Sequence, residues 1–365
     1  MRVSTLLVVF GLAGALAACD DSNKRKEPPP PPPPGSATVA SAVPAGIVVD
    51  PAQIAAFSGY PARFESAKNT ITDEKVSLGR TLYFEARLSK NQQIACSSCH
   101  VPEKFGTDGE KTSPGHKGQR GVRNSPSTYN AAAHVGQFWD GRVSTVEDQA
   151  LKPITNPAEM ALANEAAIVT VLASMPEYGL AFKKAFPDDK DPITTGNVAK
   201  ALGAFERTLA SPSRFDAFTK GDAKALSEEE KAGFQKFLSV GCNTCHSTAT
   251  FGGTEYKKLG HVKPYPNLKD NGRFDFTKQE ADRFFFKVPS LRNVEKTAPY
   301  LHDGSIATLS ETVKIMGEYQ LGKDLSEADV ASIVTFLKAL TGETPKVEKP
   351  TLPASTAKTP KPDNG

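Results

Sequence analysis

Apolar residues recur at helical spacing in two long segments of this chain. In the segment that begins at Thr195, they stand three or four positions apart, at Val198, Leu202, Phe205 and Leu209. In the segment that begins at Ser326, they stand at Val330, Ile333, Val334, Leu337 and Leu340. Because an α-helix has 3.6 residues per turn, this spacing places the apolar side chains on one face and predicts a helix in each segment.

A third helix is predicted by its start signal. Ser227 is followed three positions later by Glu230, the capping-box pattern in which each side chain caps the backbone of the other residue. Phe234 and Phe237 follow at helical spacing, and Gly241 ends the segment. The alternation of apolar and polar residues that is typical of strands does not persist in any segment. We therefore predict an all-α fold.

The longest apolar run lies at the start of the sequence, from Leu6 to Ala18. It is short for a membrane span and ends in small residues, so it predicts a signal peptide over residues 1–18. Cys19 completes a Leu-Ala-Ala-Cys motif that resembles the lipobox of bacterial lipoproteins, which predicts a lipid anchor on this cysteine. The alternative is an ordinary cleavage that leaves Cys19 as a free thiol.

Residues 19–50 and 345–365 have compositions that do not support a packed core. The first segment contains seven consecutive prolines, Pro28–Pro34, which predict a polyproline II spacer of about 20 Å at roughly 3 Å per residue. The second segment is rich in Pro, Lys and Thr and predicts a disordered tail. The chain between them has room for two domains, which we place at 51–220 and 221–344.

Charge and composition exclude two broad classes of protein. The 44 Lys and Arg residues nearly balance the 41 Asp and Glu residues, and a net charge of +3 does not suit an electrostatic nucleic-acid binder. Hydrophobic residues make up 39% of the chain but form only one long run, which excludes a polytopic membrane protein. Five cysteines are too few for a disulfide scaffold, and four of them belong to one repeated motif.

That motif, Cys-x-x-Cys-His, is the attachment pattern of c-type heme. Two thiols at this spacing can bond to the two vinyl groups of one porphyrin, and the histidine that follows can ligate the iron. A redox dithiol or half of a zinc site are alternatives, but neither requires the histidine. The predicted heme-binding residues are Cys96, Cys99 and His100 in the first half and Cys242, Cys245 and His246 in the second half.

The two halves also resemble each other after each heme motif, around an Asp-Gly pair that follows an Arg-Asn pair. The aligned pairs are Asp140-Gly141 with Asp303-Gly304 and Arg123-Asn124 with Arg292-Asn293. We therefore predict a duplicated cytochrome domain. The copies differ just before the Asp-Gly pair, where Trp139 takes the place of His302.

Function depends on which side chain reaches the second axial position of each iron. Met316 is the only methionine after the second motif, and it is either the ligand of the second iron or a helix core residue. His261 and His302 are competing candidates for that iron. For the first iron the candidates are His116, in a Gly/Pro-rich loop that could move, and His134, or no ligand at all.

The order of these and further landmarks resembles that of the bacterial diheme cytochrome c peroxidases, from about Ala55 to Gly342. The landmarks are Leu78-Gly79-Arg80, Arg87-Leu88-Ser89, Cys96 to His100, His116, Asn124, Phe138-Trp139-Asp140-Gly141-Arg142, Gln149, Asn156-Pro157-Ala158-Glu159-Met160, Cys242 to His246, Val288-Pro289-Ser290-Leu291-Arg292-Asn293, Tyr300-Leu301-His302-Asp303-Gly304 and Met316.

The resemblance implies a division of labour between two c-type hemes. The N-terminal heme would be the low-potential peroxidatic centre, and the C-terminal heme would be the high-potential centre that takes up electrons. His100 and His246 would be the proximal ligands, and Met316 the distal ligand of the C-terminal heme. His116 resembles the loop histidine that occupies the N-terminal iron at rest and leaves on reductive activation.

The resemblance also implies roles around the first heme. Trp139 resembles the tryptophan between the hemes, and Glu159 and Gln149 match polar residues of the peroxide pocket. Without the resemblance, Trp139 is more often a core residue, and the segment from Asn156 to Glu159 is a good helix start.

A calcium site is implied as well. Asn124 resembles a calcium ligand at the junction of the two halves, and the backbone carbonyls of Thr297 and Pro299 would join it. Such oxygen ligands suit a hard cation.

The activity implied by the resemblance is the reduction of hydrogen peroxide to water. The electrons would come from a small periplasmic c-type cytochrome or cupredoxin, and the enzyme would be a homodimer. One alternative is a diheme electron carrier without peroxidase activity. Another is a relative of the maturase that oxidises tryptophans of another protein, although that enzyme carries a tyrosine where this chain has Met316.

Overall fold

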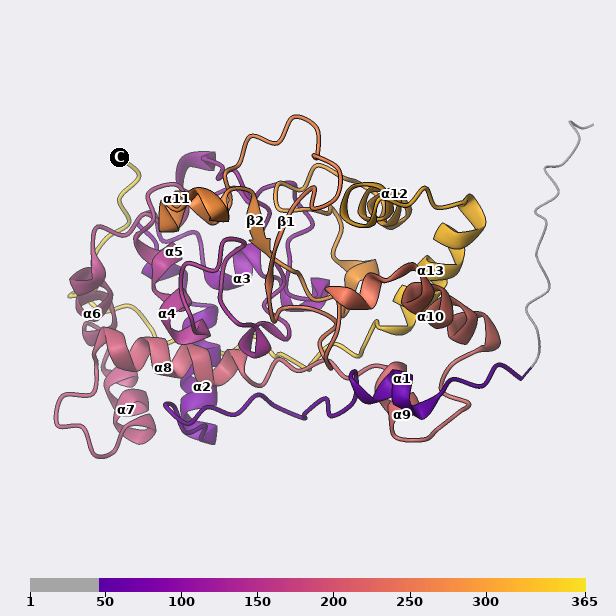
Figure 1. Ribbon diagram of the computed structural model, residues 1–365. Coiled ribbons are helices and arrows are strands. Elements are labelled where there is room, and N and C mark those ends of the chain that lie inside the picture. The colour runs from indigo at the N-terminus through magenta and orange to yellow at the C-terminus, as the bar shows by residue number, and fades with distance from the viewer. Residues whose placement is uncertain (1–45) are drawn as a thin grey trace, which may run out of the picture. The chain divides into compact units, whose positions relative to one another are not determined.

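The structure is a computed structural model that describes residues 46–365 (Figure 1). The predicted signal peptide, Cys19 and most of the predicted Pro-rich spacer lie outside the described residues. In the described part the helices are α1 Pro51–Ala55, α2 Asp73–Tyr83, α3 Cys96–Cys99, α4 Val146–Ala150, α5 Lys152–Thr155, α6 Glu165–Ala173, α7 Pro176–Ala185, α8 Thr195–Glu206, α9 Arg214–Thr219, α10 Glu228–Val240, α11 Phe274–Thr277, α12 Leu309–Ile315 and α13 Glu327–Ala339. Within residues 46–365, no helix is both long and apolar enough to span a membrane.

The three helices predicted from the sequence are confirmed, and their ends have the expected chemistry. The Ser227 and Glu230 side chains form the capping box of α10, and Gly241 ends that helix in a left-handed conformation with φ 101°. Ser326 caps α13 by accepting a hydrogen bond from the backbone N–H of Asp329. The helix predicted from Thr195 is α8, and its capping residue is Thr194.

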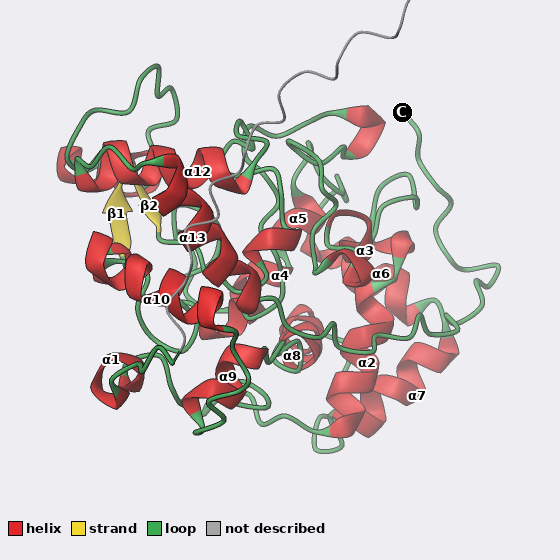
Figure 2. Cartoon of the chain, turned by 90° about the vertical axis from the view of Figure 1, so that its right-hand side faces the viewer, coloured by secondary structure: helices red, strands yellow, loops and turns green. Residues whose placement is uncertain are grey.

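The all-α prediction needs one correction. Strands β1, Tyr256–Lys258, and β2, Phe285–Lys287, form a short antiparallel sheet in which Lys257 pairs with Phe286. The strands are only three residues long, which is too short for a sequence alternation to be recognised. Long loops connect the remaining elements, and Figure 2 shows how much of the fold they occupy.

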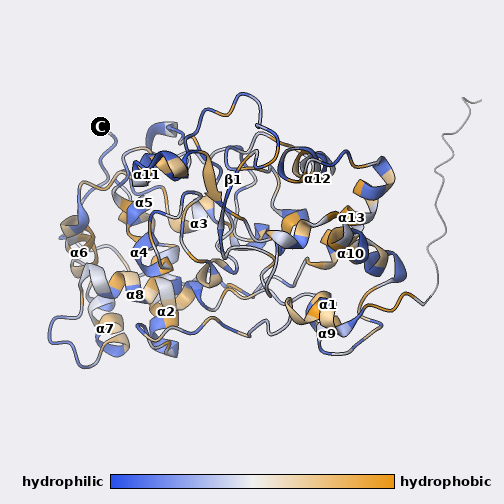
Figure 3. Ribbon diagram, in the orientation of Figure 1, coloured by the Kyte–Doolittle hydropathy of each residue, from blue (hydrophilic) through white to orange (hydrophobic). Residues whose placement is uncertain are grey.

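Two large hydrophobic cores lie in the described part of the chain, and each is built on a pair of crossing helices. In the first core α2 packs on α8, and in the second α10 packs on α13. Both pairs cross at a glycine, because a Cβ at Gly79 would collide with the carbonyl oxygen of Ala201, and a Cβ at Gly233 would collide with that of Ser332. The helices have apolar and polar stretches in Figure 3, as expected for elements with one buried face.

Each end of the described chain packs against the core that is built mainly from the other half of the chain. Val49 and Phe57, which flank α1, are buried in the second core, although the rest of that core comes from residues beyond 214. Figures 1 and 2 both show α1 beside α9. Part of the segment predicted as a spacer is therefore a core element.

The C-terminal segment 345–365 lies along the first core, which corrects the prediction of a disordered tail. It has no regular helix or strand, but its backbone and hydroxyl groups make specific hydrogen bonds. The Thr356 hydroxyl donates to the carbonyl of Ser174 at 2.8 Å, and the Gln92 side chain donates to the carbonyl of Pro360, also at 2.8 Å. Prolines and threonines keep such a segment extended, so it can follow a surface without a helical or strand pattern.

Candidate active site

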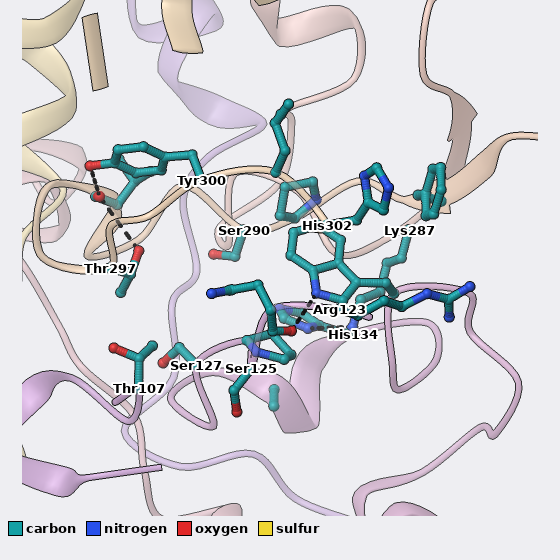
Figure 4. A pocket seen from close by; sticks show the side chains of 18 of the residues that line it. Thr107, Arg123, Ser125, Ser127, His134, Lys287, Ser290, Thr297, Tyr300 and His302 are labelled. Atoms are coloured by element: carbon teal, nitrogen blue, oxygen red, sulfur yellow. Dashed lines mark hydrogen bonds between the residues drawn. The ribbon is translucent and has the colours of Figure 1, made fainter. Parts of the chain in front are cut away.

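A single cavity lies between the two cores and is lined by both Cys-x-x-Cys-His motifs. Figure 4 shows another part of its lining, which includes Arg123, His134 and His302. All six predicted heme-binding residues line it, namely Cys96, Cys99, His100, Cys242, Cys245 and His246. The structure thus brings together two motifs that are 146 residues apart, 242 − 96, in the sequence.

The two histidines of these motifs are oriented alike. The Nδ1 atom of His100 lies 3.2 Å from the carbonyl oxygen of Gly106, and the Nδ1 atom of His246 lies 3.1 Å from that of Phe251. Since a carbonyl can only accept, each Nδ1 carries the hydrogen and each Nε2 keeps a lone pair. Burial lowers the pKa of both imidazoles, which keeps them neutral. In both histidines, Nε2 is therefore the nitrogen that is available to ligate iron.

The four thiols are in surroundings that suit heme attachment better than the alternatives. Burial raises the pKa of Cys96 to about 12 and that of Cys242 to about 11. A redox dithiol or a zinc site requires thiolates, which such surroundings disfavour. The described residues also contain no cluster of three or more His, Cys, Asp and Glu side chains that could hold a metal ion. The residues present therefore fit covalently bound heme.

On the second side of the cavity lies Met316, the predicted distal ligand. It lines the cavity at the start of a single π-helical turn, Met316–Gln320, that follows α12. Such turns are rare and occur frequently at functional sites. Of the competing candidates, His302 also lines the cavity, with its ring stacked on Phe286 at a centroid distance of 4.3 Å. His261 is exposed and does not line it.

On the first side, His116 does not line the cavity. It is buried, and neither ring nitrogen has a hydrogen-bond partner among the described residues. The His116 backbone N–H donates to the carbonyl of Glu159 at 2.7 Å, and a Cβ at Gly115 would collide with the carbonyl of Ala158. The loop is therefore packed against the turn that carries Glu159.

The predicted pocket residues Gln149 and Glu159 do line the cavity. Glu159 Oε1 accepts a hydrogen bond of 2.7 Å from the Asn156 side chain, and burial raises the pKa of the Glu159 carboxyl, while the nearby Arg142 partly opposes this. No helix begins at Asn156, which instead caps a single turn by accepting from the N–H of Ala158. The interpretation of this segment as a helix start is therefore wrong.

Trp139 lines the cavity at the tip of a hairpin in which the N–H of Gln137 donates to the carbonyl of Val143 at 2.7 Å. Its indole N–H donates to the carbonyl of Asn124 at 2.9 Å. The hairpin is held by Asp140, which is buried and accepts hydrogen bonds from Arg123 at 2.6 Å and Arg142 at 3.0 Å.

The second half contains the same hairpin. The N–H of Tyr300 donates to the carbonyl of Ile306 at 2.7 Å, so both hairpins close three residues before and three after their aspartate. The glycine that follows each aspartate is left-handed, with φ 66° at Gly141 and φ 61° at Gly304. The predicted equivalence of Trp139 and His302 agrees with this geometry.

The predicted pairing of Asn124 with Asn293 is wrong. Asn130 is the residue that matches Asn293, because both are left-handed, with φ 64° and 61°, and both lie ten residues before the hairpin aspartate. Both backbone N–H groups also donate to equivalent carbonyls at 3.1 Å, of Leu209 and Leu340.

When the two halves are aligned at Asn130 and Asn293, Asn124 matches Lys287. These two residues make reciprocal contacts between the halves. The N–H of Lys287 donates to the carbonyl of Trp139 at 2.8 Å, and the N–H of Asn124 donates to the carbonyl of His302, also at 2.8 Å. Each half therefore supports the hairpin of the other half through the same backbone position. The sequence comparison missed Lys287 because its partner in the repeat differs in chemistry.

The three predicted calcium ligands, Asn124, Thr297 and Pro299, all line the cavity. The Asn124 amide nitrogen donates to the carbonyl of Glu110 at 2.9 Å, which leaves the amide oxygen as the atom that could bind a cation.

Two attachment motifs whose histidines face one cavity, in a mainly helical fold, define the class of c-type cytochromes. Comparisons with known proteins narrow the class. The family model described as di-haem cytochrome c peroxidase matches residues 73–224. A cytochrome c551 peroxidase of Nitrosomonas europaea is 44% identical over 290 residues, which cover 79% of this chain and 86% of the relative.

A cytochrome c551 peroxidase of Pseudomonas aeruginosa is 42% identical over 318 residues, which cover 86% of this chain and 89% of the relative. The crystal structure of a MauG-like protein associated with microbial copper homeostasis matches with a TM-score of 0.71 and 31% identity, over 80% of this chain and 97% of that one. The chain therefore belongs to the di-haem cytochrome c peroxidase family of enzymes, and this membership implies two heme c groups.

Proposed function

We propose that this enzyme reduces hydrogen peroxide to water with two electrons from a small c-type cytochrome or cupredoxin. The observation that carries the proposal is the unequal supply of side chains around the cavity. On the first side, Glu159 and Gln149 line it and His116 does not. On the second side, Met316 lines it.

The bound hemes would supply the redox chemistry, since each iron can hold one of the two electrons. The reaction consumes hydrogen peroxide, two electrons and two protons, and it yields two molecules of water. Methionine ligation raises the potential of a heme, so Met316 suits the second half to accept electrons from the donor.

Glu159 is the proposed proton-transferring residue. Burial raises the pKa of its carboxyl and so favours the protonated form, and cleavage of the O–O bond requires a proton at the departing oxygen. Gln149 would orient peroxide by hydrogen bonds. The hydrogen bond from Asn156 fixes the position of the Glu159 carboxyl.

Electrons would pass from the second half to the first by way of Trp139. Its ring and carbonyl are held from both halves, by Asn124 and by Lys287. His116 would ligate the first iron in the resting state and adopt the position described above after reduction. The proximal ligands would be His100 and His246.

The test is a steady-state assay of peroxide-dependent oxidation of a reduced c-type cytochrome, with calcium present. Absence of turnover in protein that contains two hemes would contradict the proposal. If both hemes then stay low-spin after half-reduction and ignore peroxide, the protein is a diheme electron carrier. If peroxide reacts but the cytochrome is not oxidised, a maturase-like oxidase of another protein becomes the better hypothesis.

We propose further that residues 1–18 are a signal peptide and that the protein acts in the periplasm, anchored to a membrane through lipid on Cys19. Heme c is attached outside the cytoplasm, which agrees with export. Mass spectrometry of the mature N-terminus tests the anchor, and an unmodified Cys19 thiol would exclude it.

Two properties are proposed for the assembled enzyme. Calcium would bind between Asn124 and the carbonyls of Thr297 and Pro299. The protein would also form a homodimer, in which each chain has two heme domains, residues 51–220 and 221–344. Chelation of calcium should slow reductive activation, and light scattering with and without chelator measures the oligomeric state.

A further inference from the structure

The reciprocal contacts between the halves use the same backbone hydrogen bond, but the two residues that donate these bonds differ in side-chain charge. At equivalent positions, the first half supplies the neutral Asn124 and the second half supplies Lys287. Both residues line the cavity beside the hairpin of the other half. The Trp139 hairpin therefore receives this contact from a residue with an ammonium group, whereas the His302 hairpin receives it from a residue with a neutral side chain.

Lys287 is only 6% exposed, and its ammonium group lies inside the junction of the two halves. Nζ donates to the carbonyl of Gly136 at 2.9 Å, at the base of the Trp139 hairpin, and lies 3.3 Å from Nδ1 of His134. Figure 4 shows Lys287, His134, Arg123 and His302 gathered on one side of the cavity. With its backbone bond to Trp139, Lys287 therefore holds the hairpin at two points.

The charge of Lys287 is not balanced by a carboxylate. Among residues 46–365 it forms no ion pair, and its side-chain partners are a carbonyl and an imidazole. Burial lowers the pKa of Lys287 to about 8, and the charge of Asp140, which is already paired with Arg123 and Arg142, partly opposes this. His134 cannot balance the charge, because an imidazole is either neutral or positive, and burial holds the pKa of its ring well below the usual range.

A buried charge without a counter-ion is expensive, and its field is strong where the dielectric constant is low. An ammonium group has three N–H donors, of which two have partners in the protein. The third has no partner among the described residues. A heme carries two propionate carboxylates and gains or loses an electron, and both properties respond to a nearby positive charge.

We propose that Lys287 is a positioning residue for the electron path. It holds the Trp139 hairpin, and its buried positive charge raises the reduction potential of the neighbouring heme. The charge stabilises an added electron on the neighbouring heme, and it makes removal of an electron from the Trp139 indole harder. Electrons then move across the junction while Trp139 itself stays reduced. The inference rests on the proposed path between two hemes, but not on peroxide as the substrate.

The test is spectroelectrochemical titration of both hemes in the full-length holoprotein, without peroxide. Lys287→Met should lower the midpoint potential of at least one heme, and Lys287→Arg, which keeps the charge, should leave both potentials near those of the wild type. The matched control is Lys258→Met, since Lys258 lies exposed on the neighbouring strand β1. It loses the same charge but should leave both potentials unchanged.

Wild-type potentials in Lys287→Met would overturn the inference, and so would equal shifts in Lys287→Met and Lys258→Met. If Lys287→Met does not incorporate two hemes, Lys287→Gln replaces it as a neutral side chain that keeps an N–H donor. Trp139 is the only tryptophan, so ultraviolet resonance Raman spectra report its indole hydrogen bond directly. That bond should weaken in Lys287→Met and persist in Lys287→Arg.

A failed peroxidase assay would leave the titration valid, because the potentials are measured in the absence of substrate. Unchanged potentials, in contrast, would remove Lys287 from the mechanism even if the enzyme turned over peroxide. The two proposals can therefore fail separately.

Discussion

The hairpin of the first half, Gln137–Val143, and that of the second half, Tyr300–Ile306, have the same backbone and different surroundings. Asp140 is buried between two arginines, whereas Asp303 forms no ion pair within the described chain. The residue before the aspartate is Trp139 in one half and His302 in the other. The two hairpins therefore share one backbone conformation but differ in the chemistry of their side chains at the junction.

The helices behind the cavity show a second difference of this kind. The crossings of α2 with α8 and of α10 with α13 align Phe205 with Phe336, and therefore Glu206 with Leu337. Both of these residues are buried and line the cavity. A carboxyl group thus lies near Cys96, where the second half has only an aliphatic side chain. Substitutions at such pairs test whether the two halves have separate tasks.

The largest effect is expected for Glu159→Gln, which should lower the rate of peroxide reduction about 100-fold or more because it removes the proton-transferring carboxyl. Both hemes and the potential of the second heme should be unaffected. Steady-state turnover measures the loss. Glu165→Gln is the control, since Glu165 is exposed at the start of α6, and a nearly wild-type rate in Glu159→Gln would remove that residue from the mechanism.

A large effect on the other half is expected for Met316→His. Axial ligands change heme potentials over a range of roughly 0.8 V, and exchange of methionine for histidine lowers the potential. Oxidation of the donor cytochrome should slow, while the first heme should still react with peroxide when it is reduced chemically. Stopped-flow mixing separates the two steps, and an unchanged rate of donor oxidation would exclude Met316 as the ligand.

A moderate effect is expected for His116→Gly. If His116 blocks the first iron at rest, the oxidised variant should contain one high-spin heme and should react without prior reduction. Electron paramagnetic resonance detects the change of spin state. A low-spin first heme in this variant would mean that another side chain, with His134 as the remaining candidate, provides the resting ligand.

The smallest effect is expected for Glu206→Gln, on stability. Burial raises the pKa of Glu206 to about 8, whereas an unfolded chain has a value near 4.3. The folded protein therefore binds a proton that the unfolded protein releases, and this group lowers stability as the pH rises from about 4.3 to about 8.

Because glutamine has no proton to lose, the melting temperature of Glu206→Gln at pH 8 should exceed that of the wild type by a few degrees. At pH 4 the two should melt together. Thermal unfolding followed by circular dichroism measures both, and equal melting temperatures at pH 8 would show that Glu206 is ionised without cost in the folded protein.

Local signals in the sequence predicted much of this molecule. The capping box of Ser227 and Glu230 and the stop at Gly241 act within one helix, so they fixed α10 without tertiary information. The heme motifs are equally local, because one porphyrin spans two cysteines of a single turn. Glu159, Gln149 and Trp139 were found through the order of family landmarks, and all three do line the cavity.

Features that depend on contacts between distant segments were missed. The Arg-Asn pairs suggested a wrong register because Asn124 and Asn293 both follow an arginine. The equivalent residues in the structure are Asn130 and Asn293, which share a left-handed backbone conformation. The partners of Lys287 are about 150 residues away in the sequence. The path of the C-terminal segment depends on the surface it follows, which its own composition does not describe.

The exchange of chain ends between the cores limits how this protein can be divided. A cut between residues 220 and 221 would leave the second core without Val49 and Phe57 and the first core without the segment that contacts Gln92 and Ser174. Neither half could be expressed as an independent one-heme module with its full set of contacts. Each repeat is therefore braced by a segment from the opposite end of the described chain, so the boundary between the repeats in the sequence is not a boundary between separable folding units.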